Sequence, residues 1–250
     1  MRSFLIKFFL ICLTILTIGC SSSHSAKPYR IAVDVSWYPL EMMGKENNVL
    51  GFSRELLEVI AKENNVSFDF ITMNWDSLEI KLKEKKYDAI LSSLQPLPFY
   101  EEVYQFSELY LQTGPVIVMR NGTRVKDLNV LKGKEIAVQR GSTSGVRILE
   151  KIPDVIIRVY DSIPRALNDT VNEVIDGAIL DNLIATSYCY DIYQGQLEIV
   201  TPPLDQEGLR MVVLYDQNEY LMKIFDKTLS SLKKNGKYQK LLQKWQLAVP

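Results

Sequence analysis

The chain is poor in the residues that most catalytic and metal sites require. Among its 250 residues there is one histidine, His24, in a serine-rich stretch near the N-terminus, and there are three cysteines. The sequence therefore offers almost no histidine for a catalytic base or for a His-ligated metal site. Basic and acidic side chains number 29 and 30, so no excess of positive charge favours nucleic acid. We expect no catalytic residue, metal, cofactor or nucleic-acid partner.

The remaining composition is that of an ordinary globular protein. Hydrophobic residues make up 47% and charged residues 24%, which excludes a disordered, collagenous or coiled-coil chain. An apolar run over 8–18 follows the basic residues Arg2 and Lys7 and is too short to span a bilayer comfortably. A basic start, a short apolar run and small residues after it are typical of a secretory signal. We therefore expect an exported protein.

The end of this segment resembles the lipobox of bacterial lipoproteins. Gly19 and Cys20 close the apolar run and three serines follow. The resemblance implies a signal peptide over 1–19, lipidation of Cys20 and a polar tether over 20–28. Cleavage after Ser25 is the alternative, and it would give a soluble exported protein. Cys189 is then the single thiol of the folded part, and we expect it to be a buried small hydrophobe.

Strands and helices alternate along the rest of the chain, which favours an α/β fold with parallel sheets. The pattern predicts strands over 29–35, 68–73 and 87–92 and helices over 53–64, behind a Ser53 N-cap, and 76–86. After Gly114 and Pro115 the order begins again. The second unit has predicted strands over 135–139, 155–160 and 177–180, a loop over 141–145, and helices over 146–151, 163–172 and 182–190. Thr201-Pro202-Pro203 breaks the pattern, and a strand over 209–215 and helices over 219–234 and 237–243 then close the chain. Two similar lobes are predicted.

Short motifs follow one another in order along residues 29–247. They are Ile31-Ala32-Val33-Asp34 with Trp37-Tyr38-Pro39, Gly51-Phe52, Tyr87-Asp88-Ala89-Ile90, Phe106-Ser107, Leu131-Lys132-Gly133-Lys134, Val138 to Thr143, Ile175 to Asp181, and Lys234 to Tyr238 with Lys244-Trp245. Each is weak alone. In this order and spacing they resemble the solute-binding proteins of polar amino-acid ABC importers, the two-lobed periplasmic type.

The resemblance implies a type II periplasmic-binding-protein fold, in which each lobe is a mainly parallel sheet flanked by helices. Lobe 1 would comprise residues 29–112 and 208–250, and lobe 2 residues 113–207. The two crossings between them, near 112–116 and 205–208, would form a hinge. Lobes of this kind close on a ligand. A monomer that delivers its solute to a membrane permease is implied.

The resemblance also implies which residues bind the ligand. Asp34 would meet its amine or side chain, Trp37 would pack on its stem, and Asp181 would neutralise an α-ammonium. The remaining predicted ligand residues are Phe52, Ser92, Ser93, Gln95, Tyr100 and Thr143. Ligands of open α/β sheets lie at the carboxyl ends of strands, where Asp34, Ser92, Ser93, Thr143 and Asp181 fall. Read without the resemblance, Asp34 and Asp181 could equally be turn or N-cap acids.

One segment departs from the pattern of the family. The family usually has a Thr and, three residues later, an Arg that grips the ligand's α-carboxylate, whereas residues 97–100 read Leu-Pro-Phe-Tyr. Tyr100 has one donor and no charge, so it cannot replace a bidentate guanidinium. Either Arg140, Arg210 or helix N-termini hold the carboxylate, or the ligand is an amine without one. Aromatic rings at Trp37, Phe52, Phe99 and Tyr100 would suit a cation.

We therefore predict the extracytoplasmic solute receptor of an ABC importer, which binds a polar amino acid, cationic or glutamine-like, and performs no catalysis. A sensory or adhesive lipoprotein of the same fold, and an amine or peptide binder, are alternatives. A dehydratase-like enzyme, with a cleft acid such as Asp34, Asp176 or Asp181 as proton donor, is a third.

Overall fold

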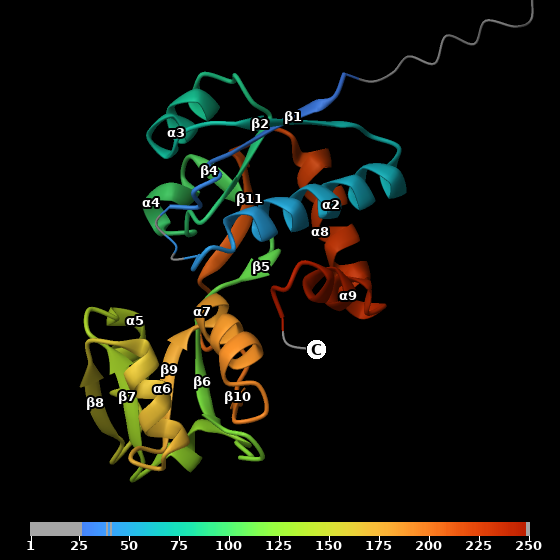
Figure 1. Cartoon of the computed structure of the whole chain (residues 1–250). Helices are drawn as coiled ribbons and strands as arrows, with labels where there is room; N and C mark the ends of the chain where they lie inside the picture. Colours follow the sequence, from blue (N-terminus) through green and yellow to red (C-terminus); the bar gives the residue numbers. More distant parts are fainter. Residues whose placement is uncertain (1–26, 39, 41, 249–250) are drawn as a thin grey trace, which may run out of the picture.

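The computed structural model describes residues 27–38, 40 and 42–248. The predicted signal peptide, the lipidated Cys20 and most of the tether lie outside the described residues. Figure 1 shows two lobes, each with its own β-sheet. The chain passes from one lobe to the other twice. The α/β class and the two-lobed architecture predicted from the sequence are confirmed.

Lobe 1 is the upper body in Figure 1. Its sheet has the order β2-β1-β3-β11-β4, with β5 paired to β11. The strands are β1 (Tyr29–Val33), β2 (Phe68–Thr72), β3 (Ala89–Ser92), β4 (Tyr104–Phe106), β5 (Leu111–Gln112) and β11 (Gly208–Leu214). The helices are α2 (Glu46–Asn64), α3 (Trp75–Lys83), α4 (Pro98–Glu101), α8 (Glu219–Lys234) and α9 (Lys237–Lys244). Segments from both ends of the chain thus build one lobe.

Lobe 2 has a five-stranded sheet of order β10-β6-β9-β7-β8. The strands are β6 (Pro115–Arg120), β7 (Glu135–Gln139), β8 (Ile156–Tyr160), β9 (Gly177–Asp181) and β10 (Leu197–Ile199). The helices are a 3₁₀ turn (Leu128–Leu131), α5 (Thr143–Leu149), α6 (Ile163–Val171) and α7 (Asn182–Ser187), which continues as a π-helical turn (Tyr188–Ile192).

Parallel pairing is confined to three strands in each lobe. The strands β2, β1 and β3 are parallel, as are β8, β7 and β9, and helices connect them as predicted. The strands that cross between the lobes pair the other way: β11 runs antiparallel to β3, and β6 antiparallel to β9. Both sheets are therefore mixed, because the crossing strands enter them from the opposite end.

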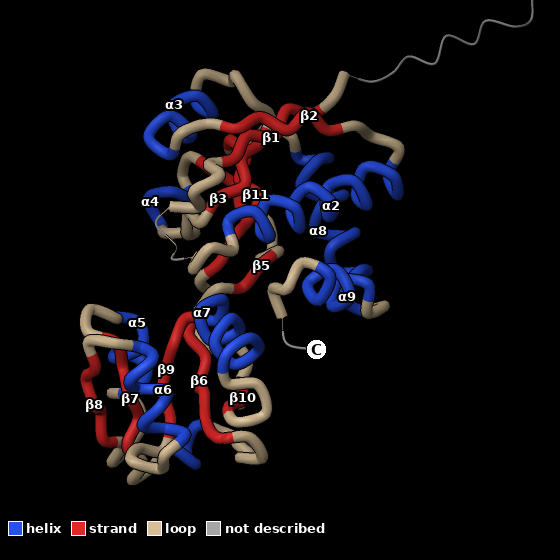
Figure 2. The backbone as a smooth tube through the Cα atoms, viewed as in Figure 1, coloured by secondary structure: helices blue, strands red, loops and turns tan. Residues whose placement is uncertain are grey.

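Figure 2 shows helices beside the strands of both lobes. Apolar side chains fill both faces of each sheet. In lobe 1 the larger core lies under α2 and α8, where Phe52, Leu56 and Phe225 are buried. In lobe 2, Cys189 is 5% exposed in the core beside α6 and α7, and burial raises the pKa of its thiol to about 12. The prediction that Cys189 is buried is confirmed.

Helix α2 begins at Glu46, well before the predicted start at Ser53. Val49 and Phe52 extend its apolar face toward the N-terminus, and both are fully buried. Ser53 is therefore inside the helix and is not its N-cap. Its hydroxyl lies 3.1 Å from the Tyr110 hydroxyl, within the core. The buried hydrogen bond accounts for a serine in a helix interior.

Candidate ligand-binding cleft

The two crossings between the lobes are hydrogen-bonded to each other. The amides of Thr113 and Gly114 both donate to the Glu207 carbonyl, at 3.0 and 3.3 Å. Gly208, at φ +155°, packs against the Leu111 carbonyl, and no Cβ would fit there. A Cβ at Gly114 would overlap the Asp205 carboxylate, so that side chain would have to shift. Gly208 is therefore the hinge glycine that close backbone contact requires.

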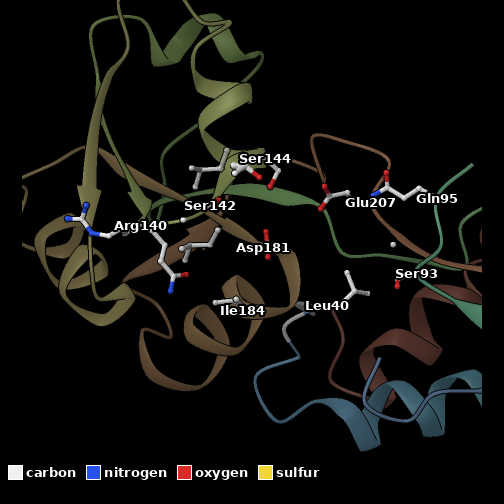
Figure 3. A pocket seen from close by; sticks show the side chains of 15 residues that line it. Leu40, Ser93, Gln95, Arg140, Ser142, Ser144, Asp181, Ile184 and Glu207 are labelled. Atoms are coloured by element: carbon white, nitrogen blue, oxygen red, sulfur yellow. The ribbon is translucent and has the colours of Figure 1, made fainter. Parts of the chain in front are cut away.

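A cleft of about 450 Å³ opens between the lobes beside this hinge (Figure 3). Lobe 1 contributes Leu40, Ser93 and Gln95, and the second crossing contributes Glu207 and Gly208. Lobe 2 lines the other wall with Gln139, Arg140, Gly141, Ser142, Thr143, Ser144, Ile179, Leu180, Asp181 and Ile184. A cleft of this size suits a small solute.

The lobe 2 wall is formed where parallel strands end. Residues 139–144 connect β7 to α5, and Asp181 ends β9 and precedes α7. Because the carboxyl ends of parallel strands share one sheet edge, these segments meet at the cleft. The predicted ligand residues Thr143 and Asp181 both line it, and the Asp181 carboxylate points into it (Figure 3). The helix begins at Thr143, inside the predicted loop.

The lobe 1 wall contains two of the predicted residues. Ser93 donates from Oγ to the Tyr38 carbonyl at 3.1 Å, and Gln95 is exposed next to it. Ser92 is 3% exposed, and its Oγ accepts a hydrogen bond from the Leu94 amide at 3.1 Å. Ser92 therefore shapes the turn that presents Ser93 and Gln95.

Three predicted residues from the N-terminal segment are buried within lobe 1, away from the cleft lining. Asp34 is 7% exposed, and its carboxylate accepts hydrogen bonds from the amide and hydroxyl of Ser36. Trp37 is 2% exposed and donates from Nε1 to the Glu46 carbonyl. Phe52 is fully buried and stacks on Tyr110. Asp34 thus stabilises a turn and the two rings pack in the core, and their contact with a ligand stays a prediction.

Tyr100 is also separate from the cleft lining. It lies in α4, its ring 6.0 Å from that of Tyr104 and 4.3 Å from that of Phe99. Pro98 is the first residue of the short helix α4. Tyr100 in this helix packs on the side of lobe 1 that holds α3. Tyr100 is thus absent from the lining of this cleft, and its position at a ligand carboxylate stays a prediction.

Neither suggested replacement for the family's arginine directs its charge into the cleft. Arg140 borders the cleft, but its guanidinium pairs with Asp161 and points away (Figure 3). Arg210 donates from Nη1 to the Ser107 carbonyl at 2.9 Å and is half-buried in lobe 1. Burial lowers its pKa, which the nearby Asp226 partly offsets. Both guanidiniums therefore have structural partners.

Glu207 is the cleft residue that the sequence analysis missed. It lies in the segment 205–208 that was assigned to the hinge, and its carboxylate faces the cleft near Ser144 and Gln95 (Figure 3). Burial raises its pKa, and the neighbouring carboxylates of Asp205 and Asp181 raise it further, while Arg147 lowers it. An acid immediately before the Gly-Leu-Arg of the second crossing was the available signal.

The described part of the chain, residues 27–38, 40 and 42–248, contains no cluster of three or more His, Cys, Asp or Glu that could hold a metal ion. No helix among these residues is long and apolar enough to cross a membrane. The residues that line the cleft offer hydroxyls, amides and carboxylates to a ligand.

A hinged two-lobed fold with a polar cleft at the strand ends is that of a solute receptor. Residues 29–248 match the bacterial extracellular solute-binding proteins, family 3, and the chain belongs to that family. It is 27% identical to the arginine-binding extracellular protein ArtP of Bacillus subtilis, over 98% of both chains. It is 29% identical to the ABC transporter arginine-binding protein 1 of Escherichia coli, over 92% of this chain and 93% of the relative.

Solved structures agree with the fold. The unliganded, open L-cystine solute receptor of Neisseria gonorrhoeae superposes with a TM-score of 0.67 at 20% identity, over 89% of this chain and 95% of the receptor. An ancestral cationic amino acid solute-binding protein superposes with a TM-score of 0.55 at 25% identity, over 87% and 95%. The family consists of binding proteins, so the receptor prediction is confirmed over the enzyme alternative.

Proposed function

We propose that the chain is the solute receptor of an ABC importer and that its solute is a polar amino acid with a cationic side chain. The observation that carries the proposal is the Asp181 carboxylate, which points into a cleft between two hinged lobes. The names of the arginine-binding relatives support the choice of an amino acid. The acids of the cleft support a cation.

Binding would proceed by closure of lobe 2 (113–207) onto lobe 1 (29–112 and 208–250). Asp181 and Thr143 would approach Ser93 and Gln95 across the cleft, with the solute between them. A hydrogen bond between Asp181 and an ammonium is worth about 1.5–3 kcal/mol net. Such a bond strengthens as closure removes water, because the local dielectric falls. The closed form would then be the one that a permease recognises.

The location of the protein follows from the same proposal. The signal over 1–19 would direct export, the Cys20 thiol would carry lipid, and the tether over 20–28 would link the anchor to the lobes. The receptor would act as a monomer on the extracytoplasmic face of a membrane. Mass spectrometry of the protein expressed in bacteria tests this: a diacylglycerol adduct on Cys20 supports it, and an unmodified N-terminus after residue 25 contradicts it.

An amine without a carboxylate is the second candidate solute. The observation in its favour is that the guanidiniums of Arg140 and Arg210 both have structural partners outside the cleft. In the amino-acid proposal, the carboxylate would instead be held by backbone amides and by hydroxyls such as those of Ser93, Ser142 and Thr143.

Thermal unfolding of residues 21–250 with a panel of solutes tests the proposal. A solute that binds only the folded protein raises the midpoint of unfolding, Tm. The panel contains the twenty amino acids, short peptides and diamines. A rise in Tm with arginine or lysine supports the proposal. A rise with diamines or peptides alone would select the second candidate, and no rise with any member would contradict a solute receptor for these classes.

A further inference from the structure

Glu207 occupies a position in the hinge that fixes its backbone. Its carbonyl accepts hydrogen bonds from the amides of Thr113 and Gly114, and its own amide donates to Asp205 Oδ1 at 2.9 Å. Gly208, the next residue, pairs with Gln112 in the sheet of lobe 1. Backbone contacts on both crossings therefore hold Glu207 at the junction of the lobes.

The side chain of Glu207 faces the cleft. Figure 3 shows its carboxylate between Ser144 of lobe 2 and Gln95 of lobe 1, on the same open space as Asp181. The two walls of the cleft thus meet at Glu207. A solute that lies against Asp181 and extends toward the hinge would reach Glu207 with its distal end.

Among the described residues, two acids and one basic residue line the cleft. Asp181 and Glu207 are the acids among the described residues that line it, and the basic residue there, Arg140, pairs with Asp161. Burial raises the pKa of Glu207, and the carboxylates of Asp205 and Asp181 raise it further, while Arg147 lowers it. A cation between the two walls would stabilise the ionised form of Glu207.

We propose that Glu207 determines the specificity of the cleft: with Asp181 it selects solutes that carry two cationic groups. Asp181 takes one ammonium and Glu207 takes the distal guanidinium or ammonium. The inference rests on the proposed function and extends it. A neutral amino acid satisfies Asp181 but brings no cation to the half-buried Glu207, so it binds more weakly.

Isothermal titration calorimetry with three probes tests the inference. L-arginine has two cationic groups, L-citrulline has nearly the same shape with a neutral end, and 1,4-diaminobutane has two ammoniums and no carboxylate. We expect the protein to bind arginine at least tenfold more tightly than citrulline. In Glu207→Gln the affinity for arginine falls at least tenfold while that for citrulline is unchanged or higher.

Two variants control this experiment. Glu150→Gln removes the same charge from an exposed position of lobe 2 and should leave all affinities unchanged. Glu207→Asp keeps the charge on a shorter side chain and should retain part of the preference for arginine, even if Glu207→Gln is poorly folded.

The outcomes separate the inference from the proposed function. Equal losses of arginine and citrulline affinity in Glu207→Gln, or none, would overturn the inference and leave the receptor function standing. Binding of 1,4-diaminobutane alone, lost in Glu207→Gln, would support the inference and contradict an amino-acid solute. Binding of none of the three probes by the unmodified protein would contradict both.

Discussion

The indole of Trp245 lies against the α-carbon of Gly51, in the space that a side chain at position 51 would occupy. The indole Nε1 donates to Glu55 Oε2 at 2.8 Å, and Lys244 Nζ contacts the same oxygen at 2.6 Å. Asn48 donates to the Trp245 carbonyl at 2.9 Å. One face of α2 therefore receives the end of α9, which joins the C-terminal helices to the N-terminal part of lobe 1.

Gly51→Ala should destabilise the protein by about 1–3 kcal/mol, because the added methyl overlaps the Trp245 ring in a well-packed contact. Urea unfolding measures the loss. In a Trp245→Ala background the same substitution should instead stabilise by about 0.5–1 kcal/mol, the ordinary gain of Gly→Ala within a helix. An equal loss in both backgrounds would mean that the indole is not the cause.

Ser53→Ala should cost about 1–3 kcal/mol, because it leaves the fully buried Tyr110 hydroxyl without its 3.1 Å partner. Burial already raises the pKa of Tyr110, so the hydroxyl stays protonated and needs an acceptor. The double variant Ser53→Ala with Tyr110→Phe removes both groups and should be more stable than Ser53→Ala alone. Urea unfolding measures the free energy of each variant. If the double variant loses the sum of the two single-variant free energies, the pairing of the two hydroxyls is contradicted.

The regular part of the fold was predictable because it depends on local periodicity. The strand 135–139 and the helix 219–234 were predicted with the bounds that the structure has. No strand is predicted over β6, because its first residues, Pro115 and Val116, lie in the predicted crossing near 112–116. The two- and three-residue strands β4, β5 and β10 depend on pairing with β11 and β6, which no local pattern records.

The cleft residues that lie at strand ends were predictable from the sequence. Whether an aromatic side chain lines the cleft or is buried in the core was not. Asp181 and Thr143 follow strands of lobe 2, and both line the cleft. Trp37 and Phe52 have residue types that suit either a ligand or a core, and packing beneath α2 buried both. The sequence analysis missed Glu207 because the crossing segment 205–208 has the polar composition of an ordinary surface loop.

Asp181→Asn should weaken binding of a cationic amino acid by about tenfold or more, because a charge-assisted hydrogen bond becomes a neutral one. The measurement is calorimetry of residues 21–250 with the solute that raises Tm most. Asp191→Asn, which removes an acid of lobe 2 beyond α7, serves as the matched control and should bind normally. Normal binding by Asp181→Asn would exclude this carboxylate from the site.

Glu207→Gln should raise the Tm of the ligand-free protein at pH 7 and should also lower the affinity for the ligand. Burial, then Asp205 and Asp181, raise the pKa of Glu207 in the folded state. The stability that its protonated form provides is present below the unfolded pKa, about 4.3, and is lost as pH rises through the folded pKa. Glutamine remains neutral throughout, so the variant should match the unmodified protein near pH 4 and exceed its Tm by about 1–3 °C at pH 7.

Differential scanning calorimetry from pH 4 to pH 7.5 measures this difference. The exposed Glu150→Gln should show the same Tm as the unmodified protein at every pH, which separates the cleft from a general effect of net charge. Saturating arginine should reverse the order at pH 7, because only Glu207 gains a counter-charge. A ligand-free Glu207→Gln that melts below the unmodified protein at pH 7 would mean that the ionised carboxylate stabilises the ligand-free protein. Glu207 would then not be the destabilising acid that a dication neutralises.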